Sequence, residues 1–174
     1  GLFAFLGMGH LKNKDFGFSC CPRLAHTKEG MNVLKVTRAN EGLSLKVTNI
    51  EYCEFESCGL VDQTNEQQSQ YSNFPSNTNT LFADLSAVSK VVKKMPFPGV
   101  LINFKEEKHF KDGGVFQEKI ARLESTMQNI ADGFEVSGIE ALTDEVIENL
   151  PTYLTFNKRR KTISATKKQA LGQD

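Results

Sequence analysis

The sequence has no net charge, no long apolar segment and no cysteine pattern of a known kind. Its 174 residues hold 21 Lys and Arg against 21 Asp and Glu. Because a balanced charge attracts neither polyanions nor acidic lipid, we expect no nucleic-acid partner and no membrane partner. No apolar run reaches the ~18 residues of a membrane helix, and nothing resembles a secretion signal. A cytoplasmic protein is the default expectation.

The residue groups of metal sites and of nucleophilic enzymes are also missing. The four cysteines are Cys20, Cys21, Cys53 and Cys58. Adjacent cysteines cannot easily bind one metal ion together, and no histidine stands at zinc-finger spacing, so we expect free thiols. A metal ion held by Cys53 and Cys58 is the remaining alternative. No Ser-His-Asp or Cys-His arrangement can be assembled around a histidine.

A strand pattern that ends in an acid is the main positive feature. Residues 45–55, LKVTNIEYCEF, begin with the alternation of a half-buried strand. Residues 31–38 form a second strand-like run, and the turn composition of residues 39–42 predicts a hairpin between the two. Ligands of open α/β sheets bind beyond the carboxyl ends of strands, so Glu51 and Tyr52 are the first site candidates. The alternative is a strand that simply ends in solvent.

Helices and further strands complete the predicted pattern. Apolar residues at helical spacing predict helices at residues 80–94 and 117–132, the first capped by Asn77 or Asn79. Residues 59–79 are poor in aliphatic side chains and predict a long surface excursion. Short apolar runs predict strands at residues 16–21, 100–104 and 153–156. This mixture of elements predicts an α/β domain with a mixed sheet.

Three further groups could contact a ligand. Glu124 falls inside the apolar stripe of the second predicted helix, where a carboxylate either lies at the stripe's edge or faces a polar ligand. The amides of Asn77 and Asn79 are either ordinary caps or partners for sugar hydroxyls. Residues 158–168 carry six positive side chains. A lysine there could neutralise a phosphate, whereas a solvated tail or a nuclear localisation signal is the alternative.

Taken in order, these segments resemble one enzyme family, the UDP-sugar pyrophosphorylases and UTP–glucose-1-phosphate uridylyltransferases. NIEYCEF is similar to the family's Asn-Val-Glu-Tyr-x-x-Leu, and YSNFPSNTNTLF to its Ser-Pro-Phe-Pro-Gly-Asn-Ile-Asn-x-Leu. The similar segments are GLFAFLGMG from Gly1, FSCCPR from Phe18, KEGMNVLKV from Lys28, NIEYCEF from Asn49, YSNFPSNTNTLF from Tyr71 and ARLESTMQNIAD from Ala121. They cover essentially the whole chain as islands, and their order and spacing make the resemblance specific.

The resemblance implies a sugar site. Gly30 would lie against the sugar, and Glu51 would accept hydrogen bonds from its hydroxyls. Asn77 and Asn79 would contact the sugar as well, and Glu124 would line the same pocket. Ser76 stands where the family has glycine, which leaves the sugar preference open.

The same resemblance implies the rest of the chemistry. Residues 164–168, SATKK, are similar to the family's Ala-Pro-Val-Lys-Asn, with Ala165 in place of proline. Lys167 would therefore bind the sugar 1-phosphate and stabilise the displacement. The substrates would be UTP and a sugar 1-phosphate. Mg²⁺ would be the cofactor, held by a residue upstream of this chain.

For the fold, the resemblance implies part of a GT-A or Rossmann-like nucleotidyltransferase domain. Residues 1–174 would form the sugar-binding half of the catalytic domain. The family's N-terminal uridine-binding loop and C-terminal β-helix domain would be absent. The rest of the parent polypeptide would then be an obligatory partner, and the fragment would be inactive alone.

Two other functions remain open at the level of sequence. A UDP-N-acetylhexosamine pyrophosphorylase of the same superfamily is one, although the aromatic pair for the acetamido group would fall near Thr126 and Gln128, which are not aromatic. A non-catalytic module that docks an acidic partner through its basic carboxy-terminal segment is the other.

Overall fold

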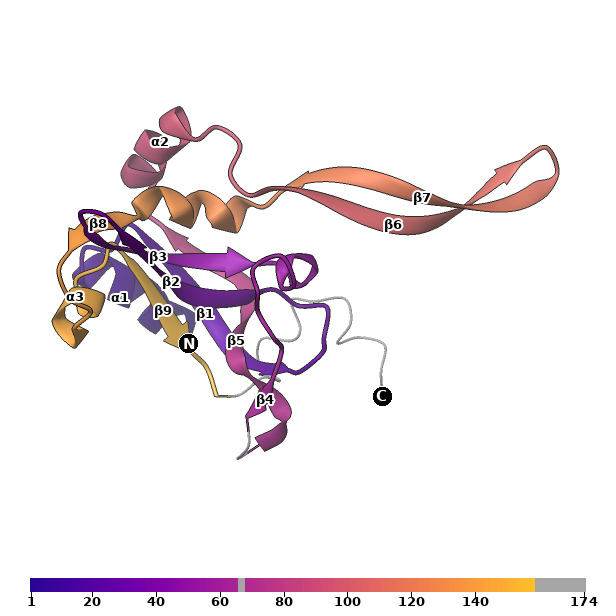
Figure 1. Cartoon of the computed structure of the whole chain (residues 1–174). Coiled ribbons are helices and arrows are strands. Elements are labelled where there is room, and N and C mark those ends of the chain that lie inside the picture. Colours follow the sequence, from indigo (N-terminus) through magenta and orange to yellow (C-terminus); the bar gives the residue numbers. More distant parts are fainter. Residues whose placement is uncertain (66–67, 159–174) are drawn as a thin grey trace.

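The body of the protein is one mixed sheet, drawn in Figure 1. The computed structural model describes residues 1–65 and 68–158, and the statements below concern these residues. The sheet consists of β1 (Phe16–Leu24), β2 (Met31–Ala39), β3 (Gly42–Ile50), β4 (Thr64–Asn65), β5 (Gln68–Ala83), β8 (Val136–Ile139) and β9 (Thr152–Phe156). Its order is β8-β3-β2-β5-β1-β9, and β4 pairs with β5. Because β1 runs parallel to β9 and antiparallel to β5, the predicted α/β class with a mixed sheet is confirmed.

Helices cover both faces of this sheet. The α-helices are α1 (Leu2–Leu11), α2 (Leu85–Lys94) and α3 (Asp144–Glu148), and the 3-10 helices are η1 (Tyr52–Glu54) and η2 (Met127–Phe134). On one face Phe18 and Leu45, both fully buried, pack with Val91 of α2 and Phe134 of η2. Burying each such side chain stabilises the fold by roughly 1.5–3 kcal/mol. On the other face α1 packs through Phe5 onto the ring of Tyr153, at 5.4 Å between ring centroids.

The predicted hairpin is confirmed. β2 and β3 pair in one uninterrupted antiparallel register from Ala39↔Gly42 to Met31↔Ile50. Gly42 has a φ of +115°, which suits the turn residue of such a hairpin. Met31 also pairs with Ser76, so the hairpin joins the rest of the sheet through β5.

Residues 59–64 are exposed or half-buried, but residues 68–79 are not the surface excursion that their composition predicts. From Gln68 the chain forms β5, which pairs with β1 up to Phe16↔Ala83. Ser76, Asn77 and Thr78 are buried at 1–2% exposure. Strand positions filled by polar side chains carry no apolar alternation, which is why the composition was misleading.

The first predicted helix begins later than expected. It is α2, and it starts at Leu85 because Asp84 caps it by accepting a hydrogen bond from the Ala87 N–H at 2.8 Å. Asn77 and Asn79 lie within β5, so their predicted role as helix caps is wrong.

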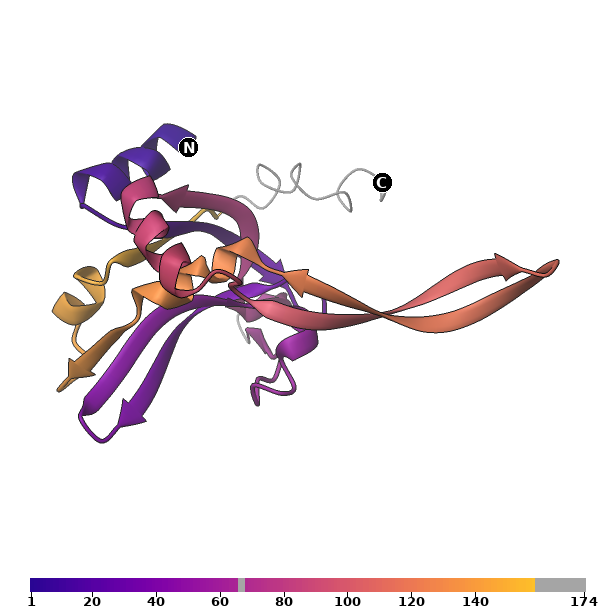
Figure 2. The same ribbon diagram turned by 90° about the horizontal axis from the view of Figure 1, so that it is seen from above.

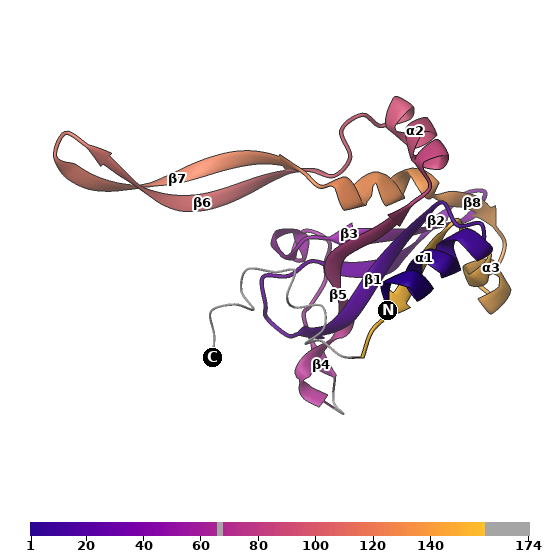
Figure 3. The same cartoon turned by 180° about the vertical axis from the view of Figure 1, so that it is seen from behind.

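The second predicted helix, at residues 117–132, is wrong. Most of it belongs to β7 (Gly114–Ser125), which pairs with β6 (Val100–Lys111) along its whole length, and the remainder is η2. The segment from Val100 to Ser125 is named the arm here. It extends away from the body in all three views of the ribbon (Figures 1, 2 and 3). Glu124 therefore lies on a strand at the base of the arm rather than in a helical stripe.

No helix within the described residues is both long enough and apolar enough to cross a lipid bilayer.

Candidate functional site

Gly30 and Glu51 face each other at the open end of the hairpin. The β2–β3 register ends at Met31↔Ile50, so the next pair outward brings Gly30 opposite Glu51. A Cβ at Gly30 would lie 3.0 Å from Glu51 Oε1 and 2.9 Å from Asn49 Oδ1. Glycine thus leaves open the space in front of a carboxylate and a carboxamide oxygen, both of which accept hydrogen bonds.

Two side-chain amides fix the carboxylate of Glu51. Asn49 Nδ2 donates to Glu51 Oε1 at 2.8 Å, and Gln128 Nε2 donates to the same oxygen at 3.0 Å. Gln128 comes from η2, whose Asn129 also donates to the Asn49 carbonyl at 3.0 Å. The carboxylate is therefore held by the strand before it and by the 3-10 helix that follows the arm.

Asn77 and Asn79 lie on the next strand of the sheet. The Asn77 N–H donates to the Gly30 carbonyl at 2.9 Å. Asn77 Nδ2 donates to Asn79 Oδ1, also at 2.9 Å. Asn79 adopts a φ of +58° where β5 bulges against β1, between the pairs Ser19↔Thr80 and Cys20↔Asn77. Bulges re-aim side chains and are common beside active sites.

Two buried asparagine oxygens near this cluster accept no hydrogen bond within the described residues. They are Asn32 Oδ1 and Asn49 Oδ1, whose residues pair directly across β2 and β3. Asn32 donates through Nδ2 to Cys20 Sγ at 3.1 Å. An unsatisfied buried acceptor costs about 1–3 kcal/mol, and a ligand hydroxyl that reached it would recover that cost.

Tyr52 and Glu124 lie at the edge of the same region. Burial raises the pKa of the Tyr52 phenol above its ordinary value, and the nearby Cys53, Glu51 and Glu124 act in the same direction. Glu124 accepts a hydrogen bond from Asn103 at 3.5 Å and pairs with Arg122 at 3.6 Å. Its place on the arm brings it within electrostatic reach of Tyr52 although the predicted helix is absent.

A buried arginine supports the loop that carries Gly30. Arg23 donates through Nη2 to the Thr27 carbonyl at 2.7 Å and through Nε to the Glu29 carbonyl at 3.0 Å. Its Nη1 donates to Asp62 Oδ1 at 2.7 Å, and its guanidinium stacks 5.1 Å from the Phe55 ring centroid. Arg23 thus ties the loop before Gly30 to the segment that follows Glu51.

The structure brings together Gly30, Glu51, Asn77 and Asn79, with Tyr52 and Glu124 beside them. Lys167 lies outside the described residues. Sequence reasoning missed the contacts of Asn49, Arg23 and Gln128. All three stand inside the segments that resemble the family, a signal that could have found them, but the wrong helix at residues 117–132 hid the direction of Gln128.

No metal-binding cluster of three or more His, Cys, Asp or Glu side chains occurs in the part of the chain that the structure describes. Cys20 and Cys21 are buried and Cys53 and Cys58 are exposed, and none of the four forms a disulfide within the described residues. Burial raises the pKa of the Cys20 thiol to about 11, so it is protonated at neutral pH.

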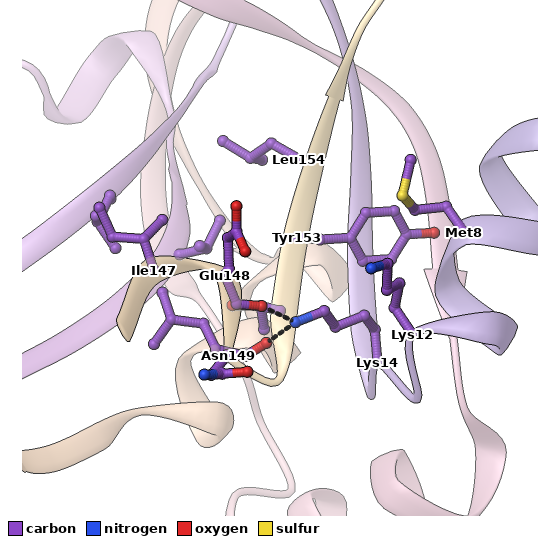
Figure 4. A pocket seen from close by; sticks show the side chains of 12 residues that line it. Met8, Lys12, Lys14, Ile147, Glu148, Asn149, Tyr153 and Leu154 are labelled. Carbon is purple, nitrogen blue, oxygen red and sulfur yellow. Dashed lines mark hydrogen bonds between the residues drawn. The ribbon is translucent and has the colours of Figure 1, made fainter. Parts of the chain in front are cut away.

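A separate cavity of about 520 Å³ lies between α1, α3 and β9 (Figure 4). Lys14 crosses it and donates to the carbonyls of Glu148 and Leu150, at 2.5 and 2.6 Å. Both oxygens lie at or just beyond the end of α3, where a cation is favourable. None of the residues in the Glu51 cluster lines this cavity.

Comparison with known proteins finds a similarity in sequence to a plant enzyme. No family model matches the chain. A chloroplastic UTP–glucose-1-phosphate uridylyltransferase 3 of Arabidopsis thaliana is 32% identical over 97% of this chain. The chain is therefore similar in sequence to a UTP–glucose-1-phosphate uridylyltransferase over nearly its whole length. The predicted resemblance is thereby confirmed, and the chain spans 20% of the length of that uridylyltransferase.

Solved structures of a UDP-glucose pyrophosphorylase give weaker likenesses. A mutant UDP-glucose pyrophosphorylase of Leishmania major has a TM-score of 0.48 and 16% identity, over 91% of this chain and 30% of its own. Another mutant of that enzyme, in complex with UDP-glucose, has a TM-score of 0.45 and 17% identity, over 86% of this chain and 29% of its own. Because both TM-scores lie below 0.5, the relationship rests on the sequence identity.

The support of the Gly30 loop is expected to depend on pH through Asp62. Burial alone would raise the pKa of Asp62, but hydrogen bonds from Arg23, the His26 N–H and Ser72 outweigh it, so this pKa lies below its ordinary value. A lowered folded-state pKa means that the stabilisation is complete above about pH 4 and is lost as the pH falls further. Asp62→Asn should lower the free energy of unfolding by about 1–3 kcal/mol at pH 7.

Urea unfolding from pH 7 to pH 2 measures this effect. The difference in the free energy of unfolding between the wild type and Asp62→Asn should become smaller as the pH falls below about 4. Asp112→Asn, at an exposed position in the turn of the arm, is the matched control and should show little change at any pH. If the difference in the free energy of unfolding between the wild type and Asp62→Asn stays constant down to pH 2, the proposed contribution of the Arg23–Asp62 ion pair is contradicted.

Proposed function

We propose that this chain is the sugar-binding part of a uridylyltransferase that makes UDP-sugar and pyrophosphate from UTP and a sugar 1-phosphate. The proposal is supported by the 32% identity to the Arabidopsis enzyme over 97% of the chain. It is supported independently by the cluster at the open end of the hairpin. Residues 1–174 would supply the sugar site, and the reaction would belong to the full-length protein.

The observation that carries the proposal is the immobilised carboxylate beside a glycine. Glu51 is held by amides from Asn49 and Gln128, and Gly30 leaves room in front of it. A fixed carboxylate accepts hydrogen bonds from neighbouring hydroxyls, which is the recognition that a hexose requires. The glycine lets the sugar approach the backbone.

In the proposed reaction a phosphate oxygen of the sugar 1-phosphate attacks the α-phosphorus of UTP. The new O–P bond forms as the bond to pyrophosphate breaks, so atoms and charge balance without a covalent enzyme intermediate. The protein chiefly positions the reactants and neutralises charge. Glu51, Asn77 and Asn79 would orient the sugar ring, and Lys167 would neutralise the phosphate.

Mg²⁺ remains part of the proposal as the cofactor that would neutralise the phosphates when it is bound. The described residues offer no three-ligand acidic cluster for it. We therefore assign no ligand in this region and no step of the sugar site to the metal.

Glucose or a close relative is the proposed sugar. An N-acetylhexosamine is disfavoured because Gln128, where the aromatic contact for the acetamido group was expected, instead donates its amide to Glu51. The alternative function, a non-catalytic module that docks an acidic partner, would depend on the basic residues 159–168. These residues lie outside the described part of the chain, so no described contact supports that function.

Glu51→Ala in the full-length protein tests the sugar site. Loss of charge-assisted hydrogen bonds worth about 1.5–3 kcal/mol should raise the KM for the sugar 1-phosphate by roughly 10- to 100-fold. The KM for UTP should stay within about twofold, because uridine is bound elsewhere in the proposal. Pyrophosphate release measured against each substrate gives both constants. Glu140→Ala, at an exposed position outside the cluster, is the matched control, and equal effects of the two variants would refute the role of Glu51.

Lys167→Ala tests the proposed phosphate contact. If the lysine stabilises the displacement, turnover of the full-length protein should fall by at least about 100-fold, the usual size of such electrostatic losses. Lys158→Ala changes a lysine of the same basic segment that has no assigned role and should leave turnover nearly unchanged. Similar losses in both variants would remove Lys167 from the mechanism.

A further inference from the structure

The arm makes a two-stranded sheet that pairs with nothing else. Within residues 1–65 and 68–158, β6 bonds only to β7, and both outer edges of the pair are open. The arm projects clear of the body in Figures 1, 2 and 3. A hairpin without further packing is marginally stable in water, and open edges invite pairing with another chain. A surface that completes the arm is therefore expected.

One face of the arm is apolar at both ends and charged in the middle. Side chains alternate between faces along each strand, and directly paired residues share a face. On this face Phe104 is 69% exposed and Phe110 is 81% exposed. Between them lie Glu106, paired with Lys119, and Lys108, paired with Gln117. Other exposed apolar side chains on the same face are Val100, Ile102, Val115 and Leu123.

The order of these residues is self-complementary. Glu107 pairs with Glu118, and both side chains lie on the opposite face of the arm. Along β6, Glu107 marks the midpoint of the pattern on the apolar face. Counting outward along β6 from this centre, Glu106 mirrors Lys108 and Phe104 mirrors Phe110. A half-turn about an axis through the centre therefore brings an acid against a base and a phenylalanine against a phenylalanine.

We propose that the arm is a homodimerisation surface, on which the arm of a second copy packs face to face and antiparallel. Such an interface has two-fold symmetry, so each contact occurs twice. Phe104 of each copy would pack on Phe110 of the other. Glu106 of each would pair with Lys108 of the other. The antiparallel arrangement also keeps the two bodies at opposite ends of the joined arms.

The area available supports a modest affinity. Each exposed phenylalanine can bury about 150 Å², so the four phenylalanines of two packed arms remove roughly 600 Å² from water, before their aliphatic neighbours are counted. Specific stable interfaces begin near about 1,200 Å². We therefore expect a dimer that dissociates on dilution.

Light scattering and sedimentation of the full-length protein over a range of concentrations test the dimer. The wild type should pass from one to two chains as concentration rises. Phe110→Asp should weaken association at least about tenfold, whereas Phe97→Asp, which changes an equally exposed phenylalanine off the arm, should not. A wild type that stays monomeric at every concentration would overturn the proposal, and this is the result expected if the arm instead docks on another protein. Equal effects of Phe110→Asp and Phe97→Asp on association would overturn it as well.

Reversing the charges of Glu106 and Lys108 distinguishes the loss of ion pairs between two copies from misfolding of the arm. Glu106→Lys alone and Lys108→Glu alone should each weaken the dimer, since like charges would meet at the centre. The double variant restores opposite charges between residue 106 of one copy and residue 108 of the other and should recover most of the wild-type association. Failure of the double variant to recover it, with circular dichroism unchanged, would also overturn the proposed packing.

Discussion

The register of one hairpin determines where the candidate site lies. The pairs from Ala39↔Gly42 to Met31↔Ile50 continue outward to bring Gly30 opposite Glu51. Side chains on a strand alternate between faces, so a slip of one residue would turn Asn49 and Glu51 to the wrong sides of the sheet. The buried Leu45 and Val47 oppose such a slip because they must face the core.

The site is a polar region built into the sheet. Asn32, Asn49 and Asn77 are all buried to 1–2% exposure, and each donates a hydrogen bond through its side-chain amide. Such buried polar groups cost stability unless they are satisfied, and two of their oxygens accept no bond within the described residues. A sugar ring rich in hydroxyls is the kind of ligand that would satisfy them.

Sequence reasoning found the parts of the fold that local patterns determine. The hairpin was predictable because strand alternation and turn composition agree over residues 31–51. The arm was not, because Ile120 and Leu123 also fit helical spacing, and only their pairing with β6 makes them a strand. Asn77 was named as a possible partner for sugar hydroxyls, but it was placed at a helix start because nothing in its neighbourhood predicts that a polar strand is buried. Gln128 could not be connected to Glu51 without the fold, because the two lie 77 positions apart in the sequence.

A crystal structure of the full-length protein with glucose 1-phosphate bound tests the central claim most directly. The account predicts a sugar hydroxyl within hydrogen-bond distance of the Glu51 carboxylate, with the ring against the backbone of Gly30. A sugar bound elsewhere, with the space in front of Gly30 and Glu51 filled by another part of the polypeptide, would contradict it.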